Sequence, residues 1–302
     1  MVSRERLTHA ARTYSLRASH LVASLIFRRQ IAGESSVKAA RVVSDLETEG
    51  VHVTSLDRLL PDAGARILDT ALAVLEQASV RDNPSLWTRA ASSSDLTAET
   101  LLSRVPQLYL LGLDARILSL AQQYLKLPVA YHGAVLRHSL VDNEFSGPRL
   151  WHQDAEDFHV LRVVVYLNDV TPGGGPFEYI PLRLGITYRD FRGLGELTNA
   201  RMQQIVPQEK WKRIFGPAGT VVLCDTAKTF HHESMQTERD RSVIMIGYSS
   251  RRPRSMKLAM SHFPAERVRP ALTKIVPSAN YSHVFGWRRS EPVATPLVSS
   301  AS

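Results

Sequence analysis

Leu161-Arg162-Val163-Val164-Val165-Tyr166-Leu167 is the stretch that decides the fold. It is rich in β-branched and aromatic residues, which favour strands. Three further runs have the same character: Val129–His138, Thr220–Cys224 and Val243–Tyr248. Several short strands separated by turn residues are typical of a double-sheet jelly roll, so the sequence predicts a mainly β core.

Turn-rich and polar segments divide this core. The glycine-rich stretch 169–176 and Gly216-Pro-Ala-Gly219 predict tight connections between strands. Residues 187–212 contain few long apolar runs, so we expect a partly helical insertion over the mouth of the barrel. A connection of this length often serves as a lid or a binding loop.

The N-terminal part, residues 1–127, has the texture of a mostly helical scaffold. Apolar residues recur at helical spacing in four segments, which are Arg12–Gln30, Val37–Glu49, Ala65–Ser79 and Asp114–Leu125. We therefore predict one domain over residues 1–302, with a jelly-roll core at 128–255 flanked by N-terminal helices. Residues 256–302 form a C-terminal extension whose last ten residues or so we expect to be loose.

Composition narrows the class of partner. The chain has a net charge of +8 and a pI near 9.8, which raises the question of nucleic-acid binding. Its basic clusters are short and lack interleaved aromatic residues, so we predict a solvated basic surface and no nucleic-acid partner. A single cysteine, Cys224, excludes an intramolecular disulfide framework and predicts a reduced, cytoplasmic setting. The apolar run Leu21–Phe27 is too short to span a bilayer.

His152 and Asp154 lie in the stretch Trp151-His-Gln-Asp154 and are separated by one residue. On an extended strand both side chains project to the same face, where a metal can take an imidazole nitrogen and a carboxylate oxygen together. The motif alone is weak evidence, because it often arises by chance.

A second histidine raises the specificity of this pattern. His231 follows the predicted strand 220–225, and Arg241 opens the next predicted strand. Two imidazoles and one carboxylate are the ligand set that holds ferrous iron with open positions for oxygen chemistry. A guanidinium is suited to holding a carboxylate through two parallel hydrogen bonds. His232 and Arg239 are the neighbouring alternatives to His231 and Arg241.

Four stretches together resemble the phytanoyl-CoA dioxygenase superfamily of iron(II)/2-oxoglutarate-dependent oxygenases. They are Leu150–Asp157, Val163–Val170, Gly174–Pro181 and Cys224–His231. The resemblance extends over about residues 110 to 250. It implies a double-stranded β-helix (jelly roll or cupin-like) in which His152, Asp154 and His231 ligate iron(II).

The resemblance also implies how the cosubstrates bind. Arg241 would pair with the distal carboxylate of 2-oxoglutarate, and O2 would take a remaining position on the metal. Gln153, between two ligands, is expected to line the site. Tyr131 and Arg137 are expected beside the cosubstrate, on a strand that also carries His132 and Ser139. Since side chains alternate along a strand, only one set of these can point inward.

Two positions depart from the family pattern. Leu182-Arg183-Leu184 stands where relatives commonly have Gly-Ser-His, which bears on the substrate pocket more than on catalysis. Glu233 stands where relatives often have glycine or a small hydroxyl residue beside the cosubstrate. The retained Asp154 argues against halogenation, because related halogenases have a small residue in its place.

Other polar residues near the motifs have structural interpretations. We expect Glu156 and Asp157 to be surface carboxylates or to lie behind the ligands, and His159 to be structural or pocket-lining. Asp225 is expected to orient the loop before His231. Cys224 is expected to be an inert core thiol.

The sequence thus predicts an iron(II)/2-oxoglutarate-dependent dioxygenase that oxidises a small molecule and releases succinate and CO2. The resemblance is compatible with a role in natural-product biosynthesis. Arg183, Arg189 and Arg192 favour an anionic or carrier-bound substrate. The alternatives are a non-catalytic binding protein and a cupin-type protein, such as an isomerase, with another metal.

Overall fold

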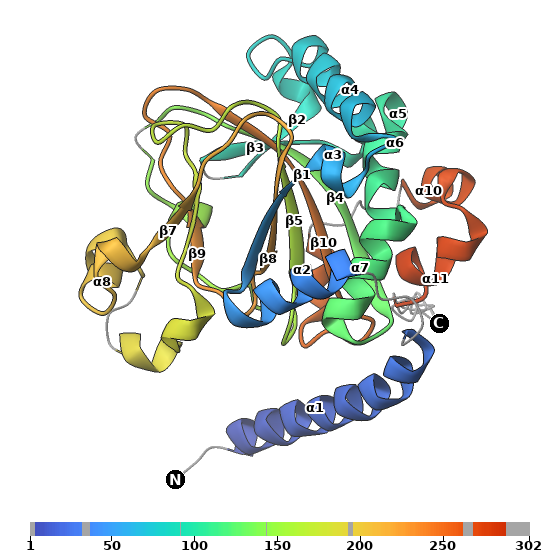
Figure 1. Ribbon diagram of the computed structural model, residues 1–302. Helices are drawn as coiled ribbons and strands as arrows, with labels where there is room; N and C mark the ends of the chain where they lie inside the picture. Colours follow the sequence, from blue (N-terminus) through green and yellow to red (C-terminus); the bar gives the residue numbers. More distant parts are fainter. Residues whose placement is uncertain are drawn as a thin grey trace, which may run out of the picture.

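The computed structural model describes residues 4–31, 37–90, 92–142, 144–192, 196–261 and 268–287, and it contains two antiparallel sheets with helices around them (Figure 1). The larger sheet has seven strands, in the order β1-β8-β5-β10-β4-β3-β2. In chain order they are β1 (Val51–Ser55), β2 (Trp87–Ala90), β3 (Ser93–Leu96), β4 (Val129–Ser139), β5 (Leu161–Tyr166), β8 (Thr220–Asp225) and β10 (Arg241–Ser250). The smaller sheet has the order β7 (Lys212–Ile214), β6 (Phe177–Tyr179) and β9 (His231–Glu233). The predicted mainly β, jelly-roll core is confirmed.

The larger sheet is buried on both faces, which explains the unbroken apolar character of β5. Val163 and Val165 pack in a cluster with residues of the helical layer. Val164 and Tyr166 pack instead in a cluster that includes Phe177 of the smaller sheet. Successive side chains of a strand point to opposite faces, so a strand covered on both sides needs apolar residues at every position.

Helices cover the outer face of the larger sheet. In chain order the helices before β4 are α1 (Arg4–Ile31), α2 (Val37–Thr48), α3 (Leu56–Leu59), α4 (Gly64–Gln77), α5 (Ala98–Arg104), α6 (Pro106–Leu110) and α7 (Ala115–Leu125). The four helices predicted from apolar spacing correspond to α1, α2, α4 and α7. The main core cluster joins residues of α4 to α7 to those of β4, β5 and β10.

The N-terminal region also contributes strands that the sequence did not predict. β1 pairs with β8 along its whole length, and β3 pairs with β4 and β2. β3, Ser93-Ser-Asp-Leu96, has no apolar alternation, so its conformation is imposed by the neighbouring strands. The described residues between 37 and 127 therefore contribute strands to the sheet as well as helices to its covering layer.

A β-bulge in β4 sets which of its side chains face the smaller sheet. Gly133 pairs with Gly247, but Tyr131 pairs with Tyr248, so His132 is an extra residue on β4. Gly133 has φ of 108°, a left-handed value that glycine adopts at no steric cost. The bulge shifts the alternation of side chains by one position.

The insertion and the C-terminal extension lie at opposite sides of the molecule (Figure 1). Residues 187–212 are partly helical, as predicted, with a 3₁₀ helix at Tyr188–Phe191 and α8 at Asn199–Gln203. The extension forms α9 (Met256–Ser261), α10 (Arg269–Ile275) and α11 (Tyr281–Val284). The tail that we expect to be loose lies outside the described residues.

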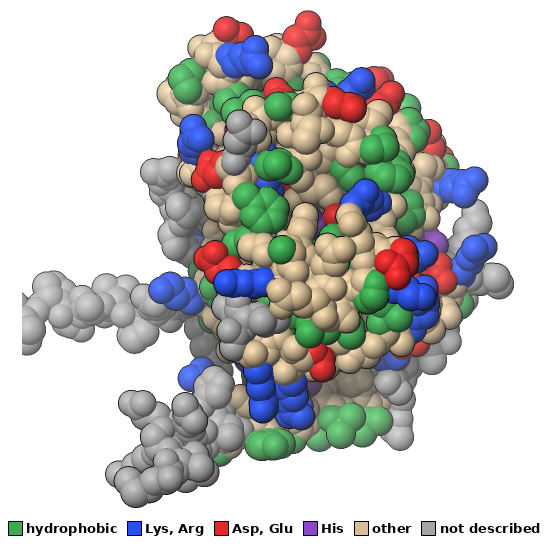
Figure 2. All heavy atoms as spheres, turned by 90° about the vertical axis from the view of Figure 1, so that its left-hand side faces the viewer, with side chains coloured by type: hydrophobic (Ala, Val, Ile, Leu, Met, Phe, Trp, Pro, Cys, Tyr) green, Lys and Arg blue, Asp and Glu red, His purple; other side chains and the backbone are tan. Residues whose placement is uncertain are grey.

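The surface on the side of the smaller sheet carries mixed charges. Figure 2 shows Lys and Arg side chains interspersed with Asp and Glu on this face, without a continuous basic stripe among the described residues. Within the described ranges, no helix is long and apolar enough to cross a membrane.

Replacing Leu108 by alanine tests the packing of the helical layer. Leu108 on α6 is fully buried in the main core cluster, so its loss should lower the free energy of unfolding by about 2 to 5 kcal/mol. Leu72 on α4 is 40% exposed, and Leu72→Ala serves as the control with a much smaller effect. Urea denaturation measures both. Equal losses of unfolding free energy in the two variants would contradict the burial of Leu108 in the helical layer.

Candidate metal centre and cavity

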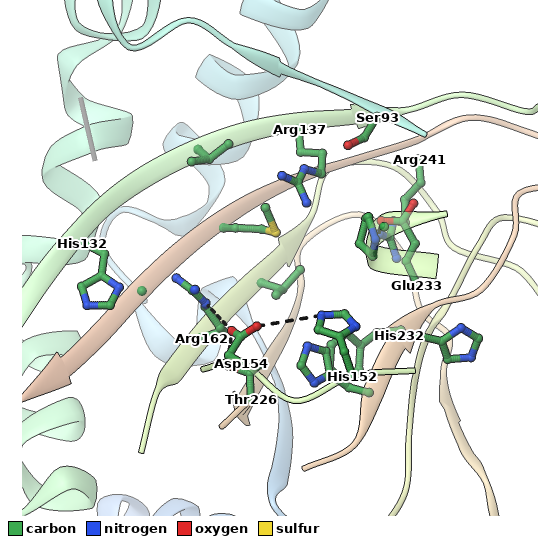
Figure 3. A pocket seen from close by; sticks show the side chains of 18 of the residues that line it. Ser93, His132, Arg137, His152, Asp154, Arg162, Thr226, His232, Glu233 and Arg241 are labelled. Atoms are coloured by element: carbon green, nitrogen blue, oxygen red, sulfur yellow. Dashed lines mark hydrogen bonds and ion pairs between the residues drawn. The ribbon is translucent and has the colours of Figure 1, made fainter. Parts of the chain in front are cut away.

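His152, Asp154 and His231 converge on one cavity between the two sheets, and Figure 3 shows the His152 and Asp154 side chains in it. One ligand atom from each of the three side chains lies within 4.8 Å of the others. The His152 Nε2 lies 3.9 Å from the Asp154 Oδ1, and the two imidazole rings are 4.4 Å apart between centroids. Among the described residues, this is the group of three that can hold a metal ion.

Backbone pairing brings the two histidines together. The His152 N–H donates to the His231 carbonyl and the His231 N–H donates to the His152 carbonyl, each at 3.0 Å. The segment that carries His152 therefore extends the smaller sheet beside β9 at this point. Two residues on, the Asp154 N–H donates to the Thr226 carbonyl at 2.8 Å, which places the carboxylate between the two sheets.

Each imidazole is held by its Nδ1 atom. The His152 Nδ1 lies 2.7 Å from the Leu150 carbonyl oxygen, and the His231 Nδ1 lies 3.0 Å from the Thr229 carbonyl oxygen. A carbonyl oxygen only accepts, so in both rings Nδ1 carries a proton and Nε2 is the atom left for a metal ion. This is the arrangement by which proteins orient metal-ligating histidines.

The Asp154 carboxylate is oriented through one oxygen. Its Oδ2 accepts a hydrogen bond of 2.6 Å from the Thr226 hydroxyl and one of 3.1 Å from the Arg162 Nε. Burial alone would raise the pKa of Asp154, but Arg162 and the two histidines outweigh this effect and hold the pKa well below its ordinary range. The carboxylate is thus ionised, with Oδ1 directed toward the histidines.

His231 is kept neutral in the folded protein. Burial, followed by the neighbouring His152, lowers the pKa of His231 to about 3. Its ring stacks on Phe177 at 5.5 Å between centroids, which adds to its desolvation. Protons therefore compete little with a metal ion for this ligand near neutral pH.

Arg162 and Thr226 are residues of this site that sequence reasoning missed. Arg162 lies within the apolar run of β5, and its guanidinium also pairs with Glu156, which is buried. Gly247 makes room for it, since a Cβ atom there would lie 2.2 Å from an Arg162 nitrogen. A lone arginine inside a run of valines is the available signal, because a buried guanidinium requires a carboxylate partner.

Arg241 also lines the cavity and is buried, but its partner belongs to the protein. Arg241 forms an ion pair with Glu233, and its Nη1 donates to the Gly175 carbonyl at 2.6 Å. Burial alone would raise the pKa of Glu233, yet the Arg241 charge lowers it overall. The pairing of Arg241 with a cosubstrate carboxylate stays a prediction.

Arg137 lies in the cavity wall with a partner of its own. Its guanidinium makes two hydrogen bonds to Asp95, of 2.6 and 2.8 Å. Asp95 comes from β3, which sequence reasoning did not predict. A role of Arg137 in cosubstrate binding also stays a prediction.

Two expected site residues lie elsewhere. Because of the bulge in β4, Tyr131 faces the helical layer, fully buried, and donates from its hydroxyl to the Tyr109 carbonyl at 2.5 Å. The Gln153 side chain points away from its neighbouring ligands, as alternation requires, and donates to the Lys228 carbonyl at 2.5 Å. Neither lines the cavity, which corrects the expectation that both do.

The alternatives to His231 and Arg241 are separated by orientation. His232 points away from Asp154 (Figure 3) and is held by Glu178, whose Oε2 lies 2.7 Å from its Nε2. Arg239 is exposed. The chain therefore presents His231 and Arg241 to the cavity.

Carboxylates around the ligand loops are buried and paired. The Asp225 carboxylate accepts a hydrogen bond of 2.6 Å from the Tyr124 hydroxyl and lies 2.6 Å from the His159 Nδ1. This arrangement fits the expected role of Asp225 in orienting the loop. Asp157 is buried rather than superficial and accepts from the Ser250 N–H at 3.0 Å. Cys224 is a fully buried thiol whose pKa is raised by burial, as expected for an inert group.

The cavity itself has a volume of about 410 Å³. Besides the polar residues above, it is lined by apolar side chains, including those of Val135, Val164, Phe177 and Met245. The arginines expected near its mouth do not line it. Arg183 pairs with Glu49 at 2.6 Å, and Arg189 and Arg192 are exposed, so their role with an anionic substrate stays a prediction.

Comparison with known proteins gives one curated relative, while no family model matches the chain. L-proline trans-4-hydroxylase of Streptomyces griseoviridis is 25% identical over 181 residues, which are 51% of this chain and 63% of that protein. The match thus spans less than two thirds of the relative.

Solved structures share the fold over most of their length. HygX from Streptomyces hygroscopicus, with nickel and 2-oxoglutarate bound, is 16% identical and covers 70% of this chain and 86% of its own, with a TM-score of 0.52. EctD from S. alaskensis in its apoform is 21% identical, and the match covers 72% of this chain and 80% of EctD, with a TM-score of 0.51. The non-heme alpha ketoglutarate dependent epimerase SnoN, from nogalamycin biosynthesis, is 16% identical over 72% and 84%, with a TM-score of 0.51.

These comparisons support the resemblance to the phytanoyl-CoA dioxygenase superfamily. The solved structures agree with this chain in fold, and the curated relative is a hydroxylase by name. The described residues also contain a His-Asp-His group that could hold a metal ion.

Replacing Thr226 by valine tests the orientation of Asp154. The change removes the hydroxyl that holds the Asp154 Oδ2, and loss of such an outer partner typically weakens metal binding roughly 10- to 100-fold. Calorimetric titration with Ni²⁺ measures the dissociation constant. Thr273→Val, on α10, is the control and should bind Ni²⁺ like the parent protein. Unchanged affinity in Thr226→Val would show that Asp154 does not depend on this contact.

The protonation states of the ligands predict the pH dependence of metal binding. The pKa of His231 is lowered to about 3 and that of Asp154 also lies below its ordinary value, so both are deprotonated at and above about pH 5. Neither residue has a proton to lose when a metal ion binds, so metal binding at and above about pH 5 should release fewer than two protons. Calorimetry in buffers of different ionisation enthalpy counts the protons. A release near two would contradict the assignment.

Proposed function

We propose that the protein is an iron(II)/2-oxoglutarate-dependent oxygenase that oxidises a small molecule and releases succinate and CO2. The observation that carries this proposal is the convergence of His152, His231 and Asp154 on one cavity, where each offers a ligand atom within 4.8 Å of the other two. Two neutral imidazoles and one ionised carboxylate suit ferrous iron and leave positions for other ligands.

The residues present fit a bound iron ion. Both Nε2 lone pairs are free because Nδ1 carries the proton, and the Asp154 Oδ1 is free because Thr226 and Arg162 hold Oδ2. When bound, iron would supply the position at which O2 and a 2-oxo acid react to oxidise the substrate. The protein would contribute fixed ligand geometry and a partly apolar chamber that limits access of water.

The cavity supports a small-molecule substrate. A volume of about 410 Å³ lies in the range of sites for small ligands, and the lining combines apolar side chains with a few polar groups. The retained carboxylate of Asp154 favours hydroxylation or desaturation over halogenation. A role in natural-product biosynthesis is supported only by the source named for SnoN.

Anaerobic spectroscopy tests the proposal. Addition of iron(II) and then 2-oxoglutarate to the parent protein should produce a charge-transfer absorption band, because both must occupy one site. Asp154→Ala removes one of three ligands, so it should lose the band and all substrate-linked succinate formation. Full turnover in this variant would sink the proposal.

The control and the alternatives have distinct outcomes. Asp190 is exposed on the insertion, so Asp190→Ala should keep the band. Metal binding without a band, in folded protein, would favour a cupin-type protein with another activity. Absence of metal binding would favour a non-catalytic binding module.

A further inference from the structure

The Glu233 carboxylate lies where Arg241 would otherwise contact the distal carboxylate of 2-oxoglutarate. Both residues line the cavity, and Figure 3 shows them close together. The Glu233 Oε2 pairs with the Arg241 Nη2, and the Arg241 Nη1 is used by the Gly175 carbonyl. The buried Arg241 Nε has no hydrogen-bond partner among the described residues, and each Nη carries one N–H beyond the contact just named.

A second buried arginine fixes Glu233 from its other side. The Glu233 Oε1 accepts a hydrogen bond of 2.6 Å from the Gln236 Nε2, and the Gln236 Oε1 accepts one of 2.5 Å from the Arg149 Nη2. Arg149 is fully buried, and Glu233 and Gln236 are nearly so. Both oxygens of Glu233 are therefore engaged in a buried network, which holds the carboxylate on Arg241.

The other guanidinium groups of the described cavity wall are also neutralised. Arg137 is paired with Asp95, and Arg162 is paired with Asp154 and Glu156. None is left over to receive the distal carboxylate of 2-oxoglutarate. That carboxylate would have to approach Glu233 at close range, and two carboxylates that share one cation repel each other strongly in a buried site.

We propose that Glu233 is a specificity-determining residue for the cosubstrate. Its carboxylate satisfies Arg241, so the cavity favours a 2-oxo acid whose far end is uncharged, and 2-oxoglutarate binds only by displacing Glu233 from Arg241. This inference rests on the proposed function, because it assumes that a 2-oxo acid chelates the bound metal. The unpartnered Nε of Arg241 offers one hydrogen bond, which an uncharged carbonyl oxygen can accept.

The test compares two 2-oxo acids of similar length in the iron(II)-loaded protein of residues 1–302, without O2. One is 2-oxoglutarate and the other is its 5-methyl ester, which lacks the distal charge. Dissociation constants come from the charge-transfer band and from calorimetry. In the parent protein the ester should bind at least as tightly as 2-oxoglutarate.

Glu233→Gln removes the charge while keeping the shape. This variant should bind 2-oxoglutarate about tenfold or more tightly than the parent does, as expected for a charged hydrogen bond gained on Arg241. Its affinity for the ester should change less than about twofold, since no distal charge is involved. Glu238→Gln removes an exposed carboxylate of the same chain and should leave both affinities unchanged.

A double variant keeps the test decisive. Glu233→Gln/Arg241→Met should lose the gain in 2-oxoglutarate affinity, because the cation is absent. If Glu233→Gln does not fold, as judged by circular dichroism, Glu233→Ser replaces it with the same expectation. Unchanged or weaker binding of 2-oxoglutarate in the folded variant would overturn the proposed role of Glu233. If the charge-transfer band still forms in that case, the proposed function stands. Absence of the band with both 2-oxo acids, in parent and variant with iron bound, would overturn the two together.

Discussion

The reciprocal backbone pair between His152 and His231 is the interaction on which the rest of the site depends. It joins a segment that follows β4 to β9 of the smaller sheet, and residues that face each other in such a pair have neighbouring Cβ atoms. The two imidazoles are side by side for this reason. Asp154 reaches the same point because its N–H donates to the carbonyl oxygen of Thr226, the residue that follows β8. Strand geometry, rather than attraction between the three side chains, therefore assembles the candidate metal centre.

Charges buried around this centre are arranged in pairs. Asp154 with Arg162, Asp95 with Arg137, and Glu233 with Arg241 place three carboxylates against three guanidinium groups. An unpaired charge in this interior would be costly, so each pair also fixes the position of its neighbour. The low pKa of Asp154 follows from this environment and keeps the carboxylate available to a cation at neutral pH.

The sequence predicted the parts of this structure that follow from local pattern. The apolar runs predicted β4, β5, β8 and β10, and the resemblance to the family favoured His231 over His232. Residues whose place is decided by distant partners were missed. Asp95 lies on a short polar strand that pairing with β4 and β2 holds in place, and the bulge at Gly133, which turns Tyr131 to the other face, arises from pairing with Gly247. Pairings over such distances leave no periodicity in either segment.

The alternation of side chains along β9 determines the position of Glu233 as well as that of His231. On β9, the side chains of His231 and Glu233 lie on one face of the strand and that of His232 lies on the other. The orientation of β9 that directs His231 into the cavity therefore directs Glu233 into the same cavity. A small residue at position 233 would leave Arg241 exposed to an incoming anion. A glutamate there meets the arginine first, because the two are held in one buried network before any ligand arrives. The Arg241 guanidinium thus binds an incoming anion or an internal carboxylate, depending on the residue at position 233, two positions after His231.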